Sequence, residues 1–193
     1  MPPATQALII ANVAVFLLEL WGGVQFFDLF ALQPGNAFQP WQLVTYGFLH
    51  DPSGFAHIFF NMFALYMFGS DIERLFGSRF YLAYYLVSVI VAGVCHLVVT
   101  SLIGAQATPM VGASGGVYGL LLAFGWYFPQ RRVMLLIPPI PMQARTFVIV
   151  FGVIEFVFGI TGTQAGVAHF AHLGGMLGGW LMIEYRRRRF TRR

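Results

Sequence analysis

The sequence predicts an all-α membrane protein, a bundle of six transmembrane helices that forms a single domain over residues 1–193. Composition is the first reason, because 58% of the residues are hydrophobic and only 9% are charged, whereas soluble domains carry about 25% charged residues. The second reason is that apolar runs of membrane length recur along the chain. The third is that arginines gather in alternate intervals between these runs.

Six apolar stretches, separated by glycine, proline or polar residues, have the composition of membrane-spanning helices. They lie at about residues 6–22, 55–70, 80–102, 113–128, 145–161 and 167–185. The second is short for a bilayer core of about 30 Å, which predicts a tilted helix or an outer end below the membrane surface. No basic segment precedes the first run and no obvious cleavage site follows it, so we expect it to remain as an anchor.

The positive charges predict the orientation of the bundle. All eleven are arginines, and they follow the second, fourth and sixth spans. Because basic loops stay in the cytoplasm, we expect both termini to be cytoplasmic. The net charge of +4 then reflects clusters at the membrane edge, and nucleic-acid binding is not expected because the chain has almost no folded polar surface. The arginines are Arg74, Arg79, Arg131, Arg132, Arg145, Arg186, Arg187, Arg188, Arg189, Arg192 and Arg193.

The interval between the first two spans, residues 23–54, is too apolar for a solvated linker, yet Pro34 and Pro40 prevent one spanning helix. We expect an interfacial first outer loop that lies partly in the membrane plane, with Trp41 and Tyr46 suited to the lipid headgroup region. A loop packed on the helices is an equally open alternative.

Four polar side chains from the second, fourth and sixth spans fall at one depth. Counting about 1.5 Å per residue from the arginines at the inner boundary places Ser114, His172 and Asn61 about 5–10 Å below the outer boundary. His57 lies one turn above Asn61. A single serine usually bonds its own helix and a single histidine usually bonds a neighbouring helix. Independent placement would scatter such residues, so their common depth favours a shared site.

The residue types at this depth suit nucleophilic catalysis. Ser114 is preceded by Gly112 and followed by Gly115, and a serine becomes a nucleophile beside a base such as imidazole. Glycine permits close backbone approach, and amides at a helix start are free to bind an anion. His57 and Asn61, spaced i and i+4, share one helical face and add donors for the same developing charge.

Small residues predict how the fourth and sixth spans meet. Two Gly-x-x-x-Gly motifs favour close approach of these helices, which brings Ser114 and His172 together. Tyr118, on the same helical face as Ser114, is expected to pack against the imidazole. The motif glycines are Gly115, Gly119, Gly175 and Gly179.

The chain resembles the rhomboid family of intramembrane serine proteases. The resemblance rests on GASG around Ser114 with Tyr118 four residues later, on HIFFN around His57 and Asn61, and on AHLGGMLGG in the last span. PWQLVTYGFLH in the first outer loop and ERLFGS after the second span add support. The motifs cover about residues 40–180 in the family's order. They imply the six-helix rhomboid-like fold of the basic bacterial form.

The resemblance also implies roles for these residues. Ser114 would be the nucleophile and His172 the general base of a dyad, and the Ser114 backbone amide, His57 and Asn61 would form the oxyanion hole. Because the family's base precedes the close-packing glycine by three residues, His172 is favoured over His169, which we expect at the membrane interface. The family usually has Trp-Arg in the first loop where this chain has Trp41-Gln42. Glu73 would cap the structure near an inner loop.

Several other polar residues receive a structural interpretation. Glu155 is a candidate third triad member, but we favour a protonated carboxyl that makes an interhelical hydrogen bond near mid-membrane, and we interpret His96 and Glu19 in the same way. A zinc site is not expected, because H-E-x-x-H is absent and His169 and His172 have no apparent carboxylate or thiol companion. No cofactor is expected.

The predicted activity is cleavage of transmembrane segments of other membrane proteins near the outer face of the bacterial inner (cytoplasmic) membrane. The family implies small residues at the cut, and substrate access between the second and fifth spans or beneath the residues 50–56 loop. One alternative is an inactive relative that binds transmembrane helices, which would lack the serine or the histidine. The other is a small channel or transporter, but the inner halves of spans four and six are nearly all apolar and no internal repeat is visible.

Overall fold

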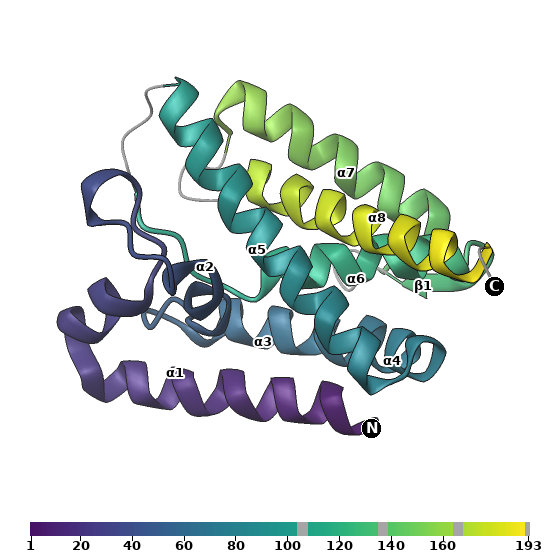
Figure 1. Cartoon of the computed structure of the whole chain (residues 1–193), viewed down its shortest axis with the longest axis horizontal. Coiled ribbons are helices and arrows are strands. Elements are labelled where there is room, and N and C mark those ends of the chain that lie inside the picture. Colours follow the sequence, from purple (N-terminus) through teal and green to yellow (C-terminus); the bar gives the residue numbers. More distant parts are fainter. Residues whose placement is uncertain (104–107, 135–138, 164–167, 192–193) are drawn as a thin grey trace.

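The computed structural model describes residues 1–103, 108–134, 139–163 and 168–191, and most of these residues are helical (Figure 1). Helix α1 (Pro3–Phe30) begins with proline in its first turn and bends at Gly23, whose φ of 60° breaks the helical backbone. The first helix is therefore longer than the predicted span 6–22, and its last two turns or so, residues 23–30, occupy part of the predicted outer loop.

The second span is a composite helix that runs without a break. It consists of α3 (Phe55–Ala64), the π-helical turn η3 (Leu65–Gly69) and α4 (Ser70–Phe76). The start at Phe55 is as predicted, but the helical backbone continues beyond residue 70 to Phe76, so the helix is longer than the predicted span. The length of the membrane-spanning part stays a prediction. The positive φ of Gly77 then turns the chain into α5 (Ser78–Ile103).

Three more long helices complete the described bundle. They are α6 (Ser114–Tyr127), α7 (Ala144–Thr161) and α8 (His169–Thr191). A short antiparallel hairpin that the sequence did not predict, β1 (Arg132–Met134) with β2 (Pro141–Gln143), lies between α6 and α7. Among the described residues, α1, α5 and α7 are long and apolar enough to cross a membrane. The chain is thus a mainly helical membrane protein, and the count of six spans stays a prediction.

Helices α5, α6 and α8 form the core of the bundle, where glycines allow backbones to touch. A side chain at Gly175 would overlap the carbonyl of Gly115, and one at Gly179 would lie 3.1 Å from the carbonyl oxygen of Gly119. Any residue larger than glycine would therefore force α6 and α8 apart. This contact sets the distance between the first turn of α6 and the first turn of α8.

The segment after α1 packs on the protein, as the alternative in the sequence analysis describes. It contains the short helices η1 (Gly35–Ala37), α2 (Gln42–Thr45) and η2 (Tyr46–Phe48). The placement of Tyr46 in the headgroup region is wrong, because its ring is buried and its hydroxyl donates to the Val89 carbonyl on α5. Trp41 is exposed, and its interfacial position stays a prediction.

Gln42 fixes the course of this segment from inside. Its side chain is buried, and its amide oxygen accepts from the backbone amides of Gln33 and Gln39 at 3.2 and 3.0 Å. Its amide nitrogen lies 3.4 Å from the carbonyl oxygens of Asp28 and Leu29. The residue that replaces the family's usual arginine therefore ties the outer loop to the end of α1.

The arginine-bearing junctions and both chain ends lie at one end of the molecule, to the right in Figure 1. There the side chain of Arg131, after α6, donates to Asp71 on α4 at 2.7 Å. Glu73 on α4 is buried and accepts hydrogen bonds from the amides of Ala4 and Thr5 at 2.9 and 2.6 Å. Glu73 therefore caps the first turn of α1, which gives a partner to amides that a helix leaves unpaired.

Candidate active site

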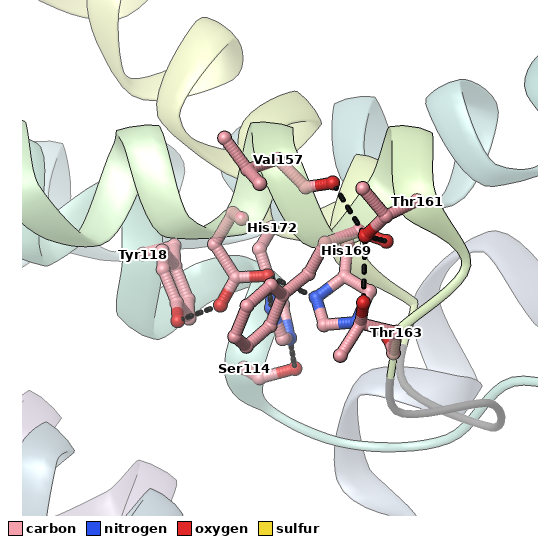
Figure 2. A network of polar contacts seen from close by, with 9 residues as sticks. Ser114, Tyr118, Val157, Thr161, Thr163, His169 and His172 are labelled. Carbon is pink, nitrogen blue, oxygen red and sulfur yellow. Dashed lines mark hydrogen bonds and ion pairs between the residues drawn. The ribbon is translucent and has the colours of Figure 1, made fainter.

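Ser114 and His172 meet at the contact between α6 and α8. Ser114 is the first residue of α6, and His172 lies in the first turn of α8. The Nε2 atom of His172 lies 2.9 Å from the hydroxyl oxygen of Ser114 (Figure 2). Because Ser114 begins a helix, the amides around it have no partners within that helix and the helix dipole favours negative charge beside it.

The imidazole of His172 is held from two sides. Tyr118, one turn after Ser114, stacks on it with ring centroids 4.2 Å apart and planes within 6° of parallel (Figure 2). On the other side, Oε2 of Glu155 from α7 lies 3.0 Å from His172 Nδ1. The ring therefore has little freedom to rotate away from Ser114.

His57 and Asn61 approach the same serine from α3. The backbone amide of Asp51 donates to His57 Nδ1 at 3.2 Å, so the neutral ring carries its proton on Nε2. A side chain added at Gly112 would lie 3.0 Å from His57 Nε2 and 3.7 Å from the Ser114 hydroxyl oxygen, so the donor and the serine face each other across this glycine. Asn61 donates to the His57 carbonyl at 2.9 Å, which ties the two residues together.

A cavity of about 530 Å³ brings these four polar residues together. His57, Asn61, Ser114 and His172 all line it, as does His96 from α5. The common depth expected from the sequence therefore corresponds to a common space. A cavity of this size holds several water molecules as well as an extended peptide segment.

A second, apolar groove of about 430 Å³ also reaches Ser114. Its walls come from the α3–η3 segment, from α6 and from α7, and Asn61 and Ser114 line both this groove and the polar cavity. Phenylalanines supply much of its surface, namely Phe60, Phe63, Phe68, Phe147 and Phe151. The serine thus lies where a polar space and a lipid-like space meet.

Glu155 makes interhelical hydrogen bonds, as predicted. One of its partners is His169, which was expected to lie at the membrane interface instead. Its Oε1 accepts a short hydrogen bond from Tyr118, and its Oε2 lies 2.6 Å from His169 Nδ1 (Figure 2). His169 is therefore buried inside the bundle, and its predicted interfacial position is wrong.

Glu155 and the two histidines also form a candidate metal-binding cluster. Ligand atoms of Glu155, His169 and His172 lie within 4.8 Å of one another, which is the kind of cluster that can hold a divalent ion. The premise that the two histidines lack a carboxylate companion is wrong, because Glu155 lies beside both of them. The sequence did not reveal this companion, since no spacing motif links α7 to α8. The expectation that the chain uses no metal stays a prediction.

Two further polar residues differ from their structural interpretation. Glu19 on α1 accepts from the backbone amide of His50 at 2.9 Å, so it holds the outer loop and not a second helix. His96 faces the polar cavity, and its Nε2 makes no hydrogen bond within the described part of the chain. Gly47, His50 and Gln42 show that the outer loop has a buried interior that its sequence did not reveal.

Known proteins are similar to this chain over most of its length. Residues 37–189 match the family model described as Rhomboid domain. Similar proteins include Rhomboid protein 1, mitochondrial, of Saccharomyces cerevisiae, 30% identical in an alignment 191 residues long that covers 93% of this chain and 52% of that protein. Rhomboid protease GluP of Bacillus subtilis is 31% identical over 140 residues, 72% of this chain and 25% of that protein.

A third relative is Rhomboid protease GlpG of Pectobacterium atrosepticum, 26% identical over 182 residues, 93% of this chain and 61% of that protein. The chain therefore spans 25% to 61% of the length of these relatives. The matched region includes α3, α6 and α8, the helices that carry His57, Ser114 and His172. Because the family model matches residues 37–189, which include most helices of this chain, the chain belongs to the rhomboid family.

Proposed function

We propose that this protein is an intramembrane serine endopeptidase that uses Ser114 as nucleophile and His172 as general base. The observation that carries the proposal is the 2.9 Å contact between the two side chains at the wall of a polar cavity. Relatives named as rhomboid proteases support the same reaction class. No cofactor enters the proposed chemistry.

The proposed reaction is acyl transfer to the serine followed by hydrolysis. The Ser114 oxygen attacks the peptide carbonyl carbon, and its proton passes to His172 Nε2 as the new carbon–oxygen bond forms. The carbonyl oxygen gains negative charge, for which the Ser114 amide, His57 Nε2–H and the Asn61 amide are the proposed donors. His172 then protonates the leaving amine, and a cavity water hydrolyses the acyl-enzyme.

The proposed substrates are transmembrane segments of other proteins. A segment in the lipid would reach Ser114 along the apolar groove between the α3–η3 segment and α7, whose surface matches an apolar helix. Its peptide bonds are hidden in a helix, so local unwinding must precede attack, and helix-breaking residues near the cut should speed cleavage. Small residues at the cut are proposed from the family resemblance.

The proposed location is the bacterial inner (cytoplasmic) membrane, with the arginine-bearing end in the cytoplasm and the polar cavity toward the outer face. The distribution of arginines supports this orientation, since basic loops are retained on the cytoplasmic side. The lipid bilayer is then the working environment, and nucleic acid is not a partner.

The test is reconstitution of the purified chain with a single-span model substrate. Ser114→Ala and His172→Ala should each lower kcat/KM at least about 10³-fold, because the two residues act as one unit. Thermal unfolding midpoints should stay near the wild-type value, and mass spectrometry should place the cut within the transmembrane segment. Full activity of either folded variant would contradict the proposal.

A fluorophosphonate probe separates the enzyme from the alternatives without a substrate. Ser114 should be labelled covalently, and His172→Ala should abolish the labelling because the hydroxyl loses its base. An inactive binding protein or a channel would show no such histidine-dependent reaction. The presence of both residues in contact supports the enzyme over the inactive relative.

A further inference from the structure

The carboxylate of Glu155 connects three side chains of the two neighbouring helices. Its Oε1 accepts from the Tyr118 hydroxyl, while its Oε2 lies 2.6 Å from His169 Nδ1 and 3.0 Å from His172 Nδ1. Glu155 is only 6% exposed. Its charge is therefore weakly screened and acts strongly on the groups around it.

His169 faces acceptor atoms on both sides of its ring. Its Nε2 lies 3.0 Å from the carbonyl oxygen of Thr163, which can only accept, so Nε2 carries a proton. Its Nδ1 faces the carboxyl of Glu155, and a second proton must lie between those two atoms. With the Tyr118 hydroxyl also donating to the carboxyl, the arrangement matches an imidazolium of His169 paired with an ionised Glu155.

The tautomer of His172 is linked to the direction of its hydrogen bond with Ser114. If the Ser114 hydroxyl donates to Nε2, that nitrogen holds no proton and the ring proton is on Nδ1, which faces Glu155. The contact of Nδ1 with Oε2 is close, but its direction is not that of a well-formed hydrogen bond. The carboxylate therefore acts on Nδ1 chiefly through its charge.

We propose that Glu155 is a positioning residue for the base, and that His169 keeps Glu155 ionised. Glu155 holds the ring proton of His172 on Nδ1, which leaves Nε2 free to take the serine proton. When that proton arrives, the new positive charge on His172 lies 3.0 Å from the carboxylate, and the proton stays on the imidazole. This role rests on the proposed function, and it replaces the purely structural role expected for Glu155.

The proposal predicts a pH dependence, which involves every titratable group that faces His172. These groups are Tyr118 on α6, Glu155 on α7, His169 on α8 itself and His57 on α3. Of these, Glu155 is the one that carries negative charge. Its removal should make the protonated form of His172 less favourable, so the base stays active at lower pH.

The experiment compares Glu155→Gln with Glu155→Asp in the purified full chain, with EDTA present so that no metal occupies the cluster. Glu155→Gln keeps the shape and removes the charge, and its amide can donate to His172 Nδ1 and favour the wrong tautomer. We expect kcat to fall about 10- to 1,000-fold with KM nearly unchanged. The acidic limb of the kcat/KM profile should move to lower pH by about one unit. Glu184→Gln, at the far end of α8, is the matched control and should behave as wild type.

Glu155→Asp keeps the negative charge on a side chain that is shorter by one methylene group. If charge governs His172, this variant should retain more activity than Glu155→Gln, with its acidic limb near the wild-type position. A merely structural carboxyl would give the reverse order, because glutamine preserves the hydrogen-bonding shape better. Equal activity of Glu155→Gln and wild type, with the same pH profile, would overturn the proposal.

A measurement on the wild-type protein remains decisive if both variants unfold. Nitrogen NMR of ¹⁵N-histidine-labelled protein should show His172 protonated on Nδ1 and His169 protonated on both nitrogens near neutral pH. A neutral His172 with its proton on Nε2 would overturn the proposal. The proposed function fails separately, if Ser114→Ala stays active, whereas the role of Glu155 fails if Ser114→Ala is inactive and Glu155→Gln is not impaired.

Discussion

At the residue scale, Gly112 occupies a position that other residues tolerate poorly. Its φ of 127° lies in the region that favours glycine. A side chain there would also lie 3.0 Å from two atoms of the His57 ring. The backbone strain and the steric conflict act together, so this glycine allows both the turn into α6 and the approach of His57 to Ser114.

We therefore expect Gly112→Ala to lower kcat about 100- to 1,000-fold, the range for the loss of one oxyanion donor. Gly35→Ala is the matched control, because Gly35 also has a positive φ, of 75°, but no atom lies within 4 Å of an added side chain. Both variants should lose about 1 kcal/mol of stability from backbone strain. Kinetics and thermal unfolding of the two proteins separate strain from the effect on His57, and equal activities would contradict this role of Gly112.

The sequence identified the residues that share short motifs, but not their further neighbours. Ser114, His57 and Asn61 could be named because glycine flanking and i, i+4 spacing are local patterns. The contact of Glu155 with His172 could not be predicted, because it depends on the rotation of α7 about its axis. In a membrane, lipid and protein surroundings are both apolar, so the hydrophobic pattern does not report which face turns inward.

At the element scale, the first turn of α1 depends on a carboxylate from another helix. Glu73 lies outside the span predicted at 55–70. Burial by itself would raise its pKa, but hydrogen bonds from Ser78, Ala4 and Thr5 have a larger combined effect in the opposite direction. The pKa of Glu73 is therefore lowered from its ordinary value of 4.5. A group with a lowered folded-state pKa stabilises the fold above its unfolded pKa, and this stabilisation is lost as pH falls through the folded value.

We expect Glu73→Gln to lower the thermal midpoint by about 2–10 °C at neutral pH, because it weakens charge-assisted hydrogen bonds to α1. The difference from wild type should shrink as pH falls below about 4.5, where the carboxylate of the unfolded chain takes up a proton, and it should be lost once pH falls through the lower pKa of the folded protein. Tryptophan fluorescence during heating in detergent measures both midpoints. A difference that is constant from pH 7 to pH 3 would contradict the proposed charge dependence.

Helix positions were more predictable than helix ends. The apolar runs located α5, α6 and α7 closely, because their length and composition are strong signals. The continuation of α1 past Gly23 and of the second span into α4 was missed, because polar or glycine residues there suggested a stop that tertiary contacts override. The hairpin of β1 and β2 has strands of three residues, too short for a periodic pattern.

At the scale of the whole molecule, the arginine-bearing ends lie together at one end of the bundle. Cysteine labelling can test the orientation, since Cys95 is the single native cysteine. In a Cys95→Ser background, Gly35→Cys should react with a membrane-impermeant maleimide in intact cells, and Arg132→Cys only after lysis. Labelling of Arg132→Cys in intact cells would contradict the proposed orientation.

The attachment of α7 has a consequence for timing. Its buried residues are Ala144 and Phe147 near one end and Glu155 toward the other, so Glu155 is the one buried side chain in the half of the helix nearest Ser114. A substrate segment that displaces α7 outward would break the contact of Glu155 with His172. Catalysis would then stop until α7 returned to its position. Selectivity among transmembrane segments would then depend on the residence time of each segment in the groove, and a segment that dissociates before α7 returns would not be cleaved.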